Sequence, residues 1–249
     1  MATAKDILGN GLETLFQQGM SHLTAGNTAV GYGIKYYILE RAAEGEKEFT
    51  IVDIGSGSGA TLAAIILGLE SAHAELHQQI KINLHGIEGC HAFYQALERD
   101  VIPAIAKKLG TLKNLNIEIT MHYGDTPQLL PTITPSGTVV YTSNYVFHRL
   151  TDATKRDLIK VINERIGEVH GALFFADMYR NTSDMPNRRY FNFGVNGPLN
   201  PGNDLTFMIG LLLGEHHFTS FKNLSTTVGV PNHVQQASKY AQEREQGFV

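Results

Sequence analysis

Residues 52–61 read VDIGSGSGAT and lead directly into the apolar segment TLAAIILGLE. A β-branched run precedes the glycines and a helical pattern follows them, so we expect a strand, a tight turn and a helix. Gly55, Gly57 and Gly59 allow backbone conformations with positive φ and leave their N–H groups open to a ligand. Because a helix N-terminus favours polar or anionic groups, the stretch predicts a ligand site at the end of a buried strand.

The same alternation continues along the chain. In all, strands are expected at 49–55, 81–88, 116–124, 138–144 and 171–177, and helices at 60–79, 91–109 and 152–169. Strand and helix repeated in this order predict an α/β fold, with a Rossmann-like doubly wound, mostly parallel sheet and helices on both faces.

Two regions fall outside this repeat. Residues 1–45 have helical patterns at 4–19 and 28–44 and are expected to form an N-terminal helical cap on a core of residues 46–249. An insertion at about 178–203 is rich in Asn, Pro, Gly and Arg, and long loops of this kind are often binding loops. Tyr32, Tyr36, Tyr179 and Arg180 are predicted substrate contacts, although packing or solvent exposure explains them equally well.

Composition excludes several classes of function. Lys and Arg total 20 against 24 Asp and Glu, so no basic surplus favours nucleic acid. The single cysteine, Cys90, and an N-terminus without a secretory pattern predict a cytoplasmic protein. The longest apolar stretch near the C-terminal third, 207–214, has eight residues, far short of the roughly 20 in a membrane helix. His216 and His217 lack a third ligand at metal spacing, so no metal site is predicted.

The glycine turn has two interpretations. Gly55, Gly57 and Ala60 satisfy the GxGxxG/A pattern of dinucleotide sites, which expects an acidic residue about 20 residues later. Glu88 ends the next expected strand but lies 29 residues after Gly59. In the second interpretation, Asp53 places a carboxylate beside the turn, where it suits a cation and would repel a pyrophosphate.

Asp53 and the three glycines resemble motif I of the class I S-adenosylmethionine (SAM)-dependent methyltransferases, small-molecule type. Glu88 matches the family acid that binds the ribose hydroxyls, and Asp125 matches the carboxylate that receives the adenine amino group. The segment TSNYVFHRL, 142–150, is similar to the segment beneath the methionine moiety and beside the substrate. The resemblance implies SAM as cofactor, held by these residues: Asp53, Gly55, Ser56, Gly57, Gly59, Glu88, Gly124, Asp125 and Asn144.

This resemblance implies methyl transfer to oxygen or nitrogen, less readily to carbon, of a small-molecule metabolite. His148 is the candidate general base and Tyr145 a lesser one, although a lone histidine after a strand is more often a structural residue. Enzymes that methylate nucleobases or glutamine amides carry Asn or Asp followed by Pro-Pro and an aromatic residue after the fourth strand. Here Asn144 precedes Tyr-Val-Phe, which disfavours those substrates.

The C-terminal sequence departs from the family, whose members finish with a helix and two more strands. A helical pattern at 232–245 is followed by Gly247, so we expect these strands to be atypical or missing, or rearranged at 216–222 and 225–230. The exposed edge at 173–176 would then be covered by its own hairpin, a second copy or a separate polypeptide. Two other functions stay open: an NAD(P)-dependent oxidoreductase, and a non-catalytic binding protein that needs a partner.

Overall fold

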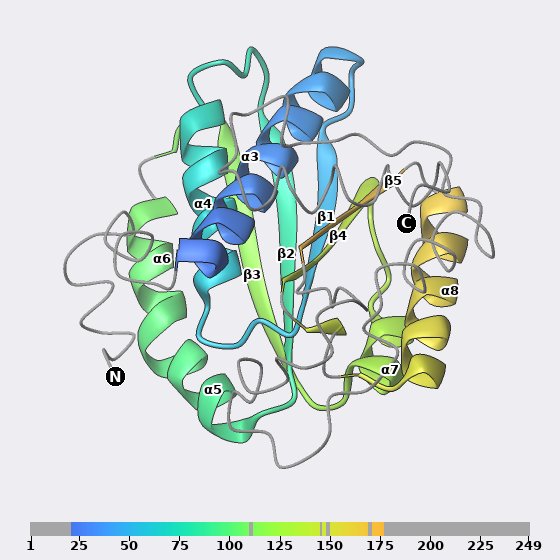
Figure 1. The fold of residues 1–249 in the computed structure, drawn as a ribbon. Helices are drawn as coiled ribbons and strands as arrows, with labels where there is room; N and C mark the ends of the chain where they lie inside the picture. Colours follow the sequence, from blue (N-terminus) through green and yellow to red (C-terminus); the bar gives the residue numbers. More distant parts are fainter. Residues whose placement is uncertain (1–20, 110–111, 145, 148–149, 169–170, 177–249) are drawn as a thin grey trace.

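The computed structural model describes residues 21–109, 112–144, 146–147, 150–168 and 171–176. They contain a parallel sheet of five strands in the order β3-β2-β1-β4-β5 (Figure 1). The strands are β1 (Glu48–Ile54), β2 (Ile80–Glu88), β3 (Leu115–Tyr123), β4 (Thr138–Asn144) and β5 (Gly171–Ala176). The chain winds outward from β1 to β3 and then returns to β4, so the strand order reverses between β1 and β4. Ligands of such sheets bind at the carboxyl ends of the strands at this point. The predicted α/β fold is confirmed.

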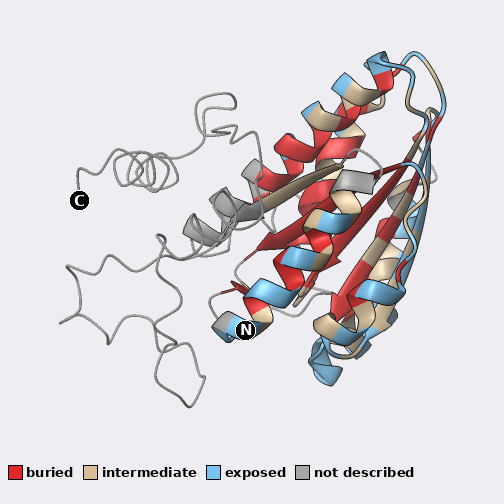
Figure 2. Cartoon of the chain, turned by 90° about the vertical axis from the view of Figure 1, so that its right-hand side faces the viewer, coloured by how far each residue is buried: buried red, intermediate tan, exposed pale blue. Residues whose placement is uncertain are grey.

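Helices cover both faces of the sheet (Figure 1). One face carries α3 (Ser21–Ala43), α4 (Ala60–Ala72) and α6 (Ile102–Leu109), and the other carries α7 (Thr126–Leu129) and α8 (Asp152–Glu168). Alternate strand residues enter different cores: Phe49 and Ile51 join the cluster under α3 and α4, whereas Val52 and Ile54 join the cluster under α8. Figure 2 shows the buried residues concentrated in the layers between helices and sheet.

Every strand begins and ends within one residue of its predicted position, but three helices differ from the prediction. The helix expected over 28–44 begins seven residues earlier, at Ser21. The helix expected over 60–79 ends at Ala72, because the chain turns there through a Glu75 N–H to Ala72 carbonyl bond and buries Leu76 in the core. Residues 91–109 form α5 (His91–Ala96), a π-helical turn η1 (Leu97–Val101) and α6. Pro103 offers a reason: it donates no N–H bond and crowds the carbonyl four residues earlier, which a wider turn accommodates.

The connection between β3 and β4 holds two short elements that the sequence analysis did not predict. They are α7 and the 3₁₀ turn η2 (Leu130–Thr132). Pro127 and Pro131 occupy early positions of these turns, where a missing N–H is tolerated.

Two glycines bring α3 directly against α4. A Cβ added at Gly31 would lie 2.4 Å from the Ala64 carbonyl oxygen, and one added at Gly68 would lie 2.4 Å from the Gly31 carbonyl oxygen. The two helix backbones therefore touch where no side chain intervenes. This contact holds the cap helix at a fixed height above the sheet.

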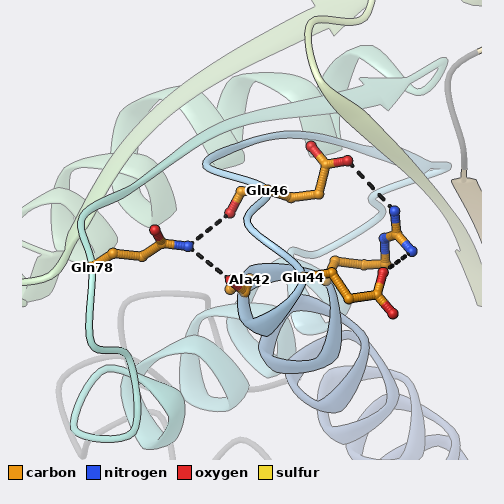
Figure 3. A network of polar contacts seen from close by, with 5 residues as sticks. Ala42, Glu44, Glu46 and Gln78 are labelled. Carbon is orange, nitrogen blue, oxygen red and sulfur yellow. Dashed lines mark hydrogen bonds and ion pairs between the residues drawn. The ribbon is translucent and has the colours of Figure 1, made fainter.

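The carboxyl end of α3 is held at the amino edge of the sheet (Figure 3). Gln78 Nε2 donates to the carbonyl oxygens of Ala42 (2.8 Å) and Glu46 (3.2 Å). The Arg41 guanidinium pairs with Glu44 and, at 3.4 Å, with Glu46. Because α3 runs antiparallel to the strands, its first turns lie at their carboxyl ends, where the glycine turn also lies.

Several expectations concern residues outside the described ranges. They are the helix at 4–19, the insertion at 178–203 and the rearranged strands and final helix after 203. Within the described ranges, no helix has the length and apolar character needed to cross a membrane.

Candidate functional site

The glycine turn joins β1 to α4 with three residues in left-handed conformations. The φ values are 72° at Gly55, 54° at Gly57 and 87° at Gly59. At Gly55 the lack of a side chain has a second purpose, because an added Cβ would lie 2.5 Å from Val146 Cγ2. Val146, two residues after the end of β4, therefore packs directly on the turn.

Protein acceptors occupy most N–H groups of this turn. Gly55 and Ser56 donate to the Ile87 carbonyl oxygen at 2.9 and 3.0 Å, and Gly59 donates to the Ser56 carbonyl oxygen at 2.9 Å. Gly57 donates to Glu88 Oε2 at 2.6 Å. A pyrophosphate would need these groups as donors, so the turn is poorly suited to a dinucleotide.

Glu88 ends β2 and lies against the turn. Besides the Gly57 N–H it receives the Cys90 N–H on Oε1 at 2.6 Å, and the residue is 7% exposed. Two backbone donors thus fix the carboxylate in one orientation. Each oxygen retains a lone pair for a further donor such as a hydroxyl group.

Asp53 lies on β1 beneath the turn and is completely buried. Neither carboxylate oxygen has a hydrogen-bond partner among the described residues. Burial, reinforced by the charge of Glu88, raises the pKa of Asp53 from 3.8 to about 7, while the Ser56 hydroxyl lowers this pKa by a smaller amount. The hydrogen bond of that hydroxyl itself goes to the Asp53 carbonyl oxygen at 3.4 Å. A buried carboxylate without a donor is costly unless a cation or donor completes it.

More uncompensated polar atoms lie at the end of β4. Thr142 pairs with Asp53 across the two strands, and its hydroxyl has no partner in the described part of the chain. The same holds for the Ser143 hydroxyl and for Asn144 Oδ1. Strand alternation places Thr142 and Asn144 on the same sheet face as Asp53. This face therefore carries a group of buried acceptors at the carboxyl ends of β1 and β4.

The end of β3 supplies the remaining predicted cofactor residues. Gly124, with φ of 145°, donates its N–H to the Glu88 carbonyl oxygen at 3.1 Å and so ties β3 to β2. Asp125 follows at the N-cap position of α7, but its exposed side chain makes no capping bond. Its carboxylate is thus available near Glu88, whose strand partner is Tyr123.

Of the predicted substrate and catalytic residues, the structure describes Tyr32 and Tyr36. Tyr145, His148, Tyr179 and Arg180 lie outside the described residues and stay predictions. Tyr32 and Tyr36 lie on the outer face of α3, 42% and 46% exposed, with Lys35 Nζ 5.4 Å from the Tyr36 ring centre.

Asn27 and Thr61 were missed by the sequence analysis. Both contact Asn144 through hydrogen bonds: Asn144 Nδ2 donates to Asn27 Oδ1 at 2.9 Å and to Thr61 Oγ1 at 3.2 Å. Thr61 lies next to the glycine motif, which was a signal that could have been followed. Asn27 is 117 residues from Asn144, and no local pattern links the two.

No group of three or more His, Cys, Asp or Glu side chains suited to a metal ion occurs within the ranges the structure describes. His85 and His122 form a pair on the opposite sheet face, with Nδ1 and Nε2 3.0 Å apart.

No protein-family model and no curated protein matches the sequence. This chain is similar in structure to the plantazolicin methyltransferase BamL, which was solved in complex with a triazolic desmethylPZN analogue and SAH. The two are 13% identical with a TM-score of 0.42, and the match covers 97% of this chain and 91% of that chain. The plantazolicin methyltransferase BpumL with SAH is 14% identical with a TM-score of 0.45, covering 96% and 89%. PigF with SAH is 14% identical with a TM-score of 0.28, covering 63% and 40%. These three structures are at most 14% identical to this chain, with TM-scores of at most 0.45.

Proposed function

We propose that the protein is a SAM-dependent methyltransferase that acts on oxygen or nitrogen, less readily carbon, of a small molecule. One observation carries this proposal: Asp53 is a buried carboxylate without a hydrogen-bond partner in the described chain, directly beneath a glycine turn and beside Glu88. A site built around two carboxylates favours a cationic ligand over a phosphorylated one.

The residues fit the chemical groups of SAM one by one. Its ammonium suits the acceptor group formed by Asp53, Thr142 and Asn144, whose free oxygens lack donors in the described residues. Its ribose hydroxyls suit Glu88, which two backbone N–H groups hold in place. Its adenine amino group suits the exposed Asp125 carboxylate at the end of β3.

SAM supplies a methyl group bound to a sulfonium sulfur. The neutral thioether that remains after methyl transfer is a good leaving group. The protein therefore has to align the acceptor atom with the methyl group and exclude water. Alignment alone is worth about 7–11 kcal/mol in well-oriented systems. Val146 packs on Gly55, and this contact supports a position for the methyl acceptor close to the turn. His148, with Tyr145 as second candidate, is proposed as the base for acceptors that must lose a proton.

The net charge of −4 and the sequence after Asn144 favour a small metabolite over nucleic acid. We propose that the protein acts in the cytoplasm, either as a homodimer or with a second polypeptide that covers the edge of β5. Light scattering after size-exclusion chromatography tests the assembly; a monomer argues against both partners.

Calorimetric titration with SAM, its demethylated product SAH and NAD tests the proposed cofactor. We expect binding of SAM and SAH and no binding of NAD. Binding of NAD alone would refute the methyltransferase and support the oxidoreductase. Binding of SAM without turnover on any tested acceptor would favour the non-catalytic alternative.

The variant Glu88→Gln makes the test specific to the site. It removes the charge that receives the Gly57 and Cys90 N–H groups, so affinity for SAM should fall about 10- to 100-fold, as for the loss of a charged hydrogen bond. Glu118→Gln is the matched control. Glu118 is exposed on β3 and lies on the other sheet face from Glu88, so this variant should leave the affinity for SAM unchanged. Equal affinity of both variants would contradict the ribose assignment.

A further inference from the structure

Three elements meet in one buried polar cluster at the carboxyl edge of the sheet. α3 contributes Asn27, the first turn of α4 contributes Thr61 and the last position of β4 contributes Asn144. Their exposures are 7%, 5% and 8%, so water competes little for their hydrogen bonds. Polar residues buried at such a junction need their bonds satisfied within the cluster.

The hydrogen bonds of the cluster define the orientation of the Asn144 carboxamide. Its Nδ2 donates to Asn27 Oδ1 at 2.9 Å and to Thr61 Oγ1 at 3.2 Å. The Thr61 hydroxyl donates in turn to Asn27 Oδ1 at 3.2 Å. Rotating the Asn144 carboxamide alone by half a turn would bring its oxygen against Asn27 Oδ1, and two acceptors would face each other.

The fixed orientation leaves Asn144 Oδ1 as a buried acceptor without a partner in the described chain. It lies on the same sheet face as the Asp53 carboxylate and the Thr142 hydroxyl, which likewise lack partners there. Acceptors on neighbouring strands thus converge where a cation with several N–H donors would complete them.

We propose that Asn27 and Thr61 are positioning residues, which hold the Asn144 carboxamide so that its Oδ1 accepts a hydrogen bond from the ammonium group of the cofactor. This inference rests on the proposed methyltransferase function. It gives the cap helix a role in cofactor binding, whereas the sequence analysis assigned that helix to substrate.

The docking of α3 makes this positioning possible. Asn27 lies one helical turn before Gly31, whose backbone touches α4 at Ala64 and Gly68. The glycine contact therefore sets the distance at which Asn27 Oδ1 meets the side chains of Thr61 and Asn144.

The pair Thr61→Val and Thr61→Ser tests the inference. Valine has nearly the same shape but no hydroxyl, so Asn144 loses one of its two acceptors and SAM affinity should fall about 10-fold. Serine keeps the hydroxyl and should restore the affinity to that of the unmodified protein. Calorimetry with SAM and SAH provides the measurement, and thermal melting checks that both variants fold.

A ligand without the ammonium separates positioning from a general structural effect. 5′-Methylthioadenosine carries the adenosine and the sulfur but no amino-acid tail, so Thr61→Val should not change its affinity. Equal weakening of SAM and methylthioadenosine, or unchanged SAM affinity, would overturn the inference. Failure of the unmodified protein to bind SAM would instead refute the proposed function itself.

If Thr61→Val does not fold, the pair Asn27→Leu and Asn27→Asp replaces it. Leucine removes the acceptor of both Asn144 and Thr61 and should weaken SAM binding, whereas aspartate keeps an acceptor oxygen and should preserve it. SAM affinity that is the same in both variants would contradict the positioning role.

Discussion

Asp53 combines a cost to stability with a benefit to binding. Burial raises the pKa of its carboxyl from 3.8 to about 7, and each pH unit corresponds to about 1.4 kcal/mol. Below pH 4 the carboxyl is protonated in both the folded and the unfolded protein, so its ionisation adds no penalty. Between pH 4 and 7 the unfolded chain releases the proton and the folded chain retains it, so folding stability falls as pH rises. Above pH 7 the full penalty, about 4 kcal/mol, is present in the empty protein.

Asp53→Asn should therefore stabilise the empty protein at pH 8 while it abolishes tight SAM binding. An asparagine without partners costs about 1–3 kcal/mol itself, so we expect a net gain of about 1–3 kcal/mol. Urea unfolding at pH 8 and at pH 4.5 measures this gain, which should disappear or change sign at the lower pH. A variant that is less stable than the unmodified protein at both pH values would show that Asp53 has a structural partner.

At the scale of elements, the contact between α3 and α4 depends on two glycines. Alanine is intrinsically better than glycine in a helix by about 1 kcal/mol, so propensity alone predicts that Gly31→Ala stabilises the protein. The structure predicts the opposite, because the new Cβ would lie 2.4 Å from the Ala64 carbonyl oxygen and the helices would have to separate. We expect a loss of about 1–3 kcal/mol in denaturant unfolding, as for overpacked cores. Stabilisation by Gly31→Ala would show that α3 is not docked in this way.

The same substitution, Gly31→Ala, should also weaken SAM binding, since it moves Asn27 away from Asn144.

The strand pattern of the sequence was enough to predict β1 to β5, because β-branched runs ended by Gly, Asp, Glu or Asn mark buried parallel strands. The glycine turn was predicted from the same local pattern. Asp53 and Glu88 also stand at strand ends, and their roles in binding SAM stay predictions. Asn27 could not be predicted, because its partner lies 117 residues away and only the docking of α3 brings them together.

The helix predicted at 91–109 is interrupted by a π-helical turn, for a reason that its periodicity does not reveal. Helical periodicity extends through the whole segment, and the sequence analysis counted it as one helix. The π-helical turn Leu97–Val101 precedes Pro103, whose missing N–H is a local signal that periodicity alone does not weigh. Sequence patterns thus predicted where elements lie but not how two helices approach or where one changes its pitch.

At the scale of the whole molecule, the affinity for SAM should depend on pH, because Asp53 in the acceptor group gains or loses a proton. A bound cation favours the charged form of Asp53, so below about pH 7 binding must expel the proton that the empty protein retains. SAM affinity should therefore increase with pH up to about 7 and then level off. The increase in melting temperature at a fixed SAM concentration should be larger at pH 8 than at pH 5.5.

The histidine pair His85 and His122 also makes stability depend on pH, but with the opposite sign. Burial lowers both pKa values, and the neighbouring His122 lowers that of His85 further, so the unfolded protein takes up protons more readily below pH 6.5 and stability falls on acidification. Because the pair lies on the other sheet face from Asp53, it affects the empty and the SAM-bound protein alike. The difference between the two melting temperatures therefore isolates Asp53.

Calorimetry at pH 6 in two buffers with different ionisation enthalpies measures the expelled proton directly. The apparent binding enthalpy should differ between the buffers in proportion to the protons released, and this difference should vanish in Asp53→Asn. Binding that is as tight at pH 5.5 as at pH 8, with no buffer dependence, would mean that Asp53 is already ionised in the empty protein. The buried carboxylate would then have to be compensated by a group other than the cofactor, and the main support for a cationic ligand would be lost.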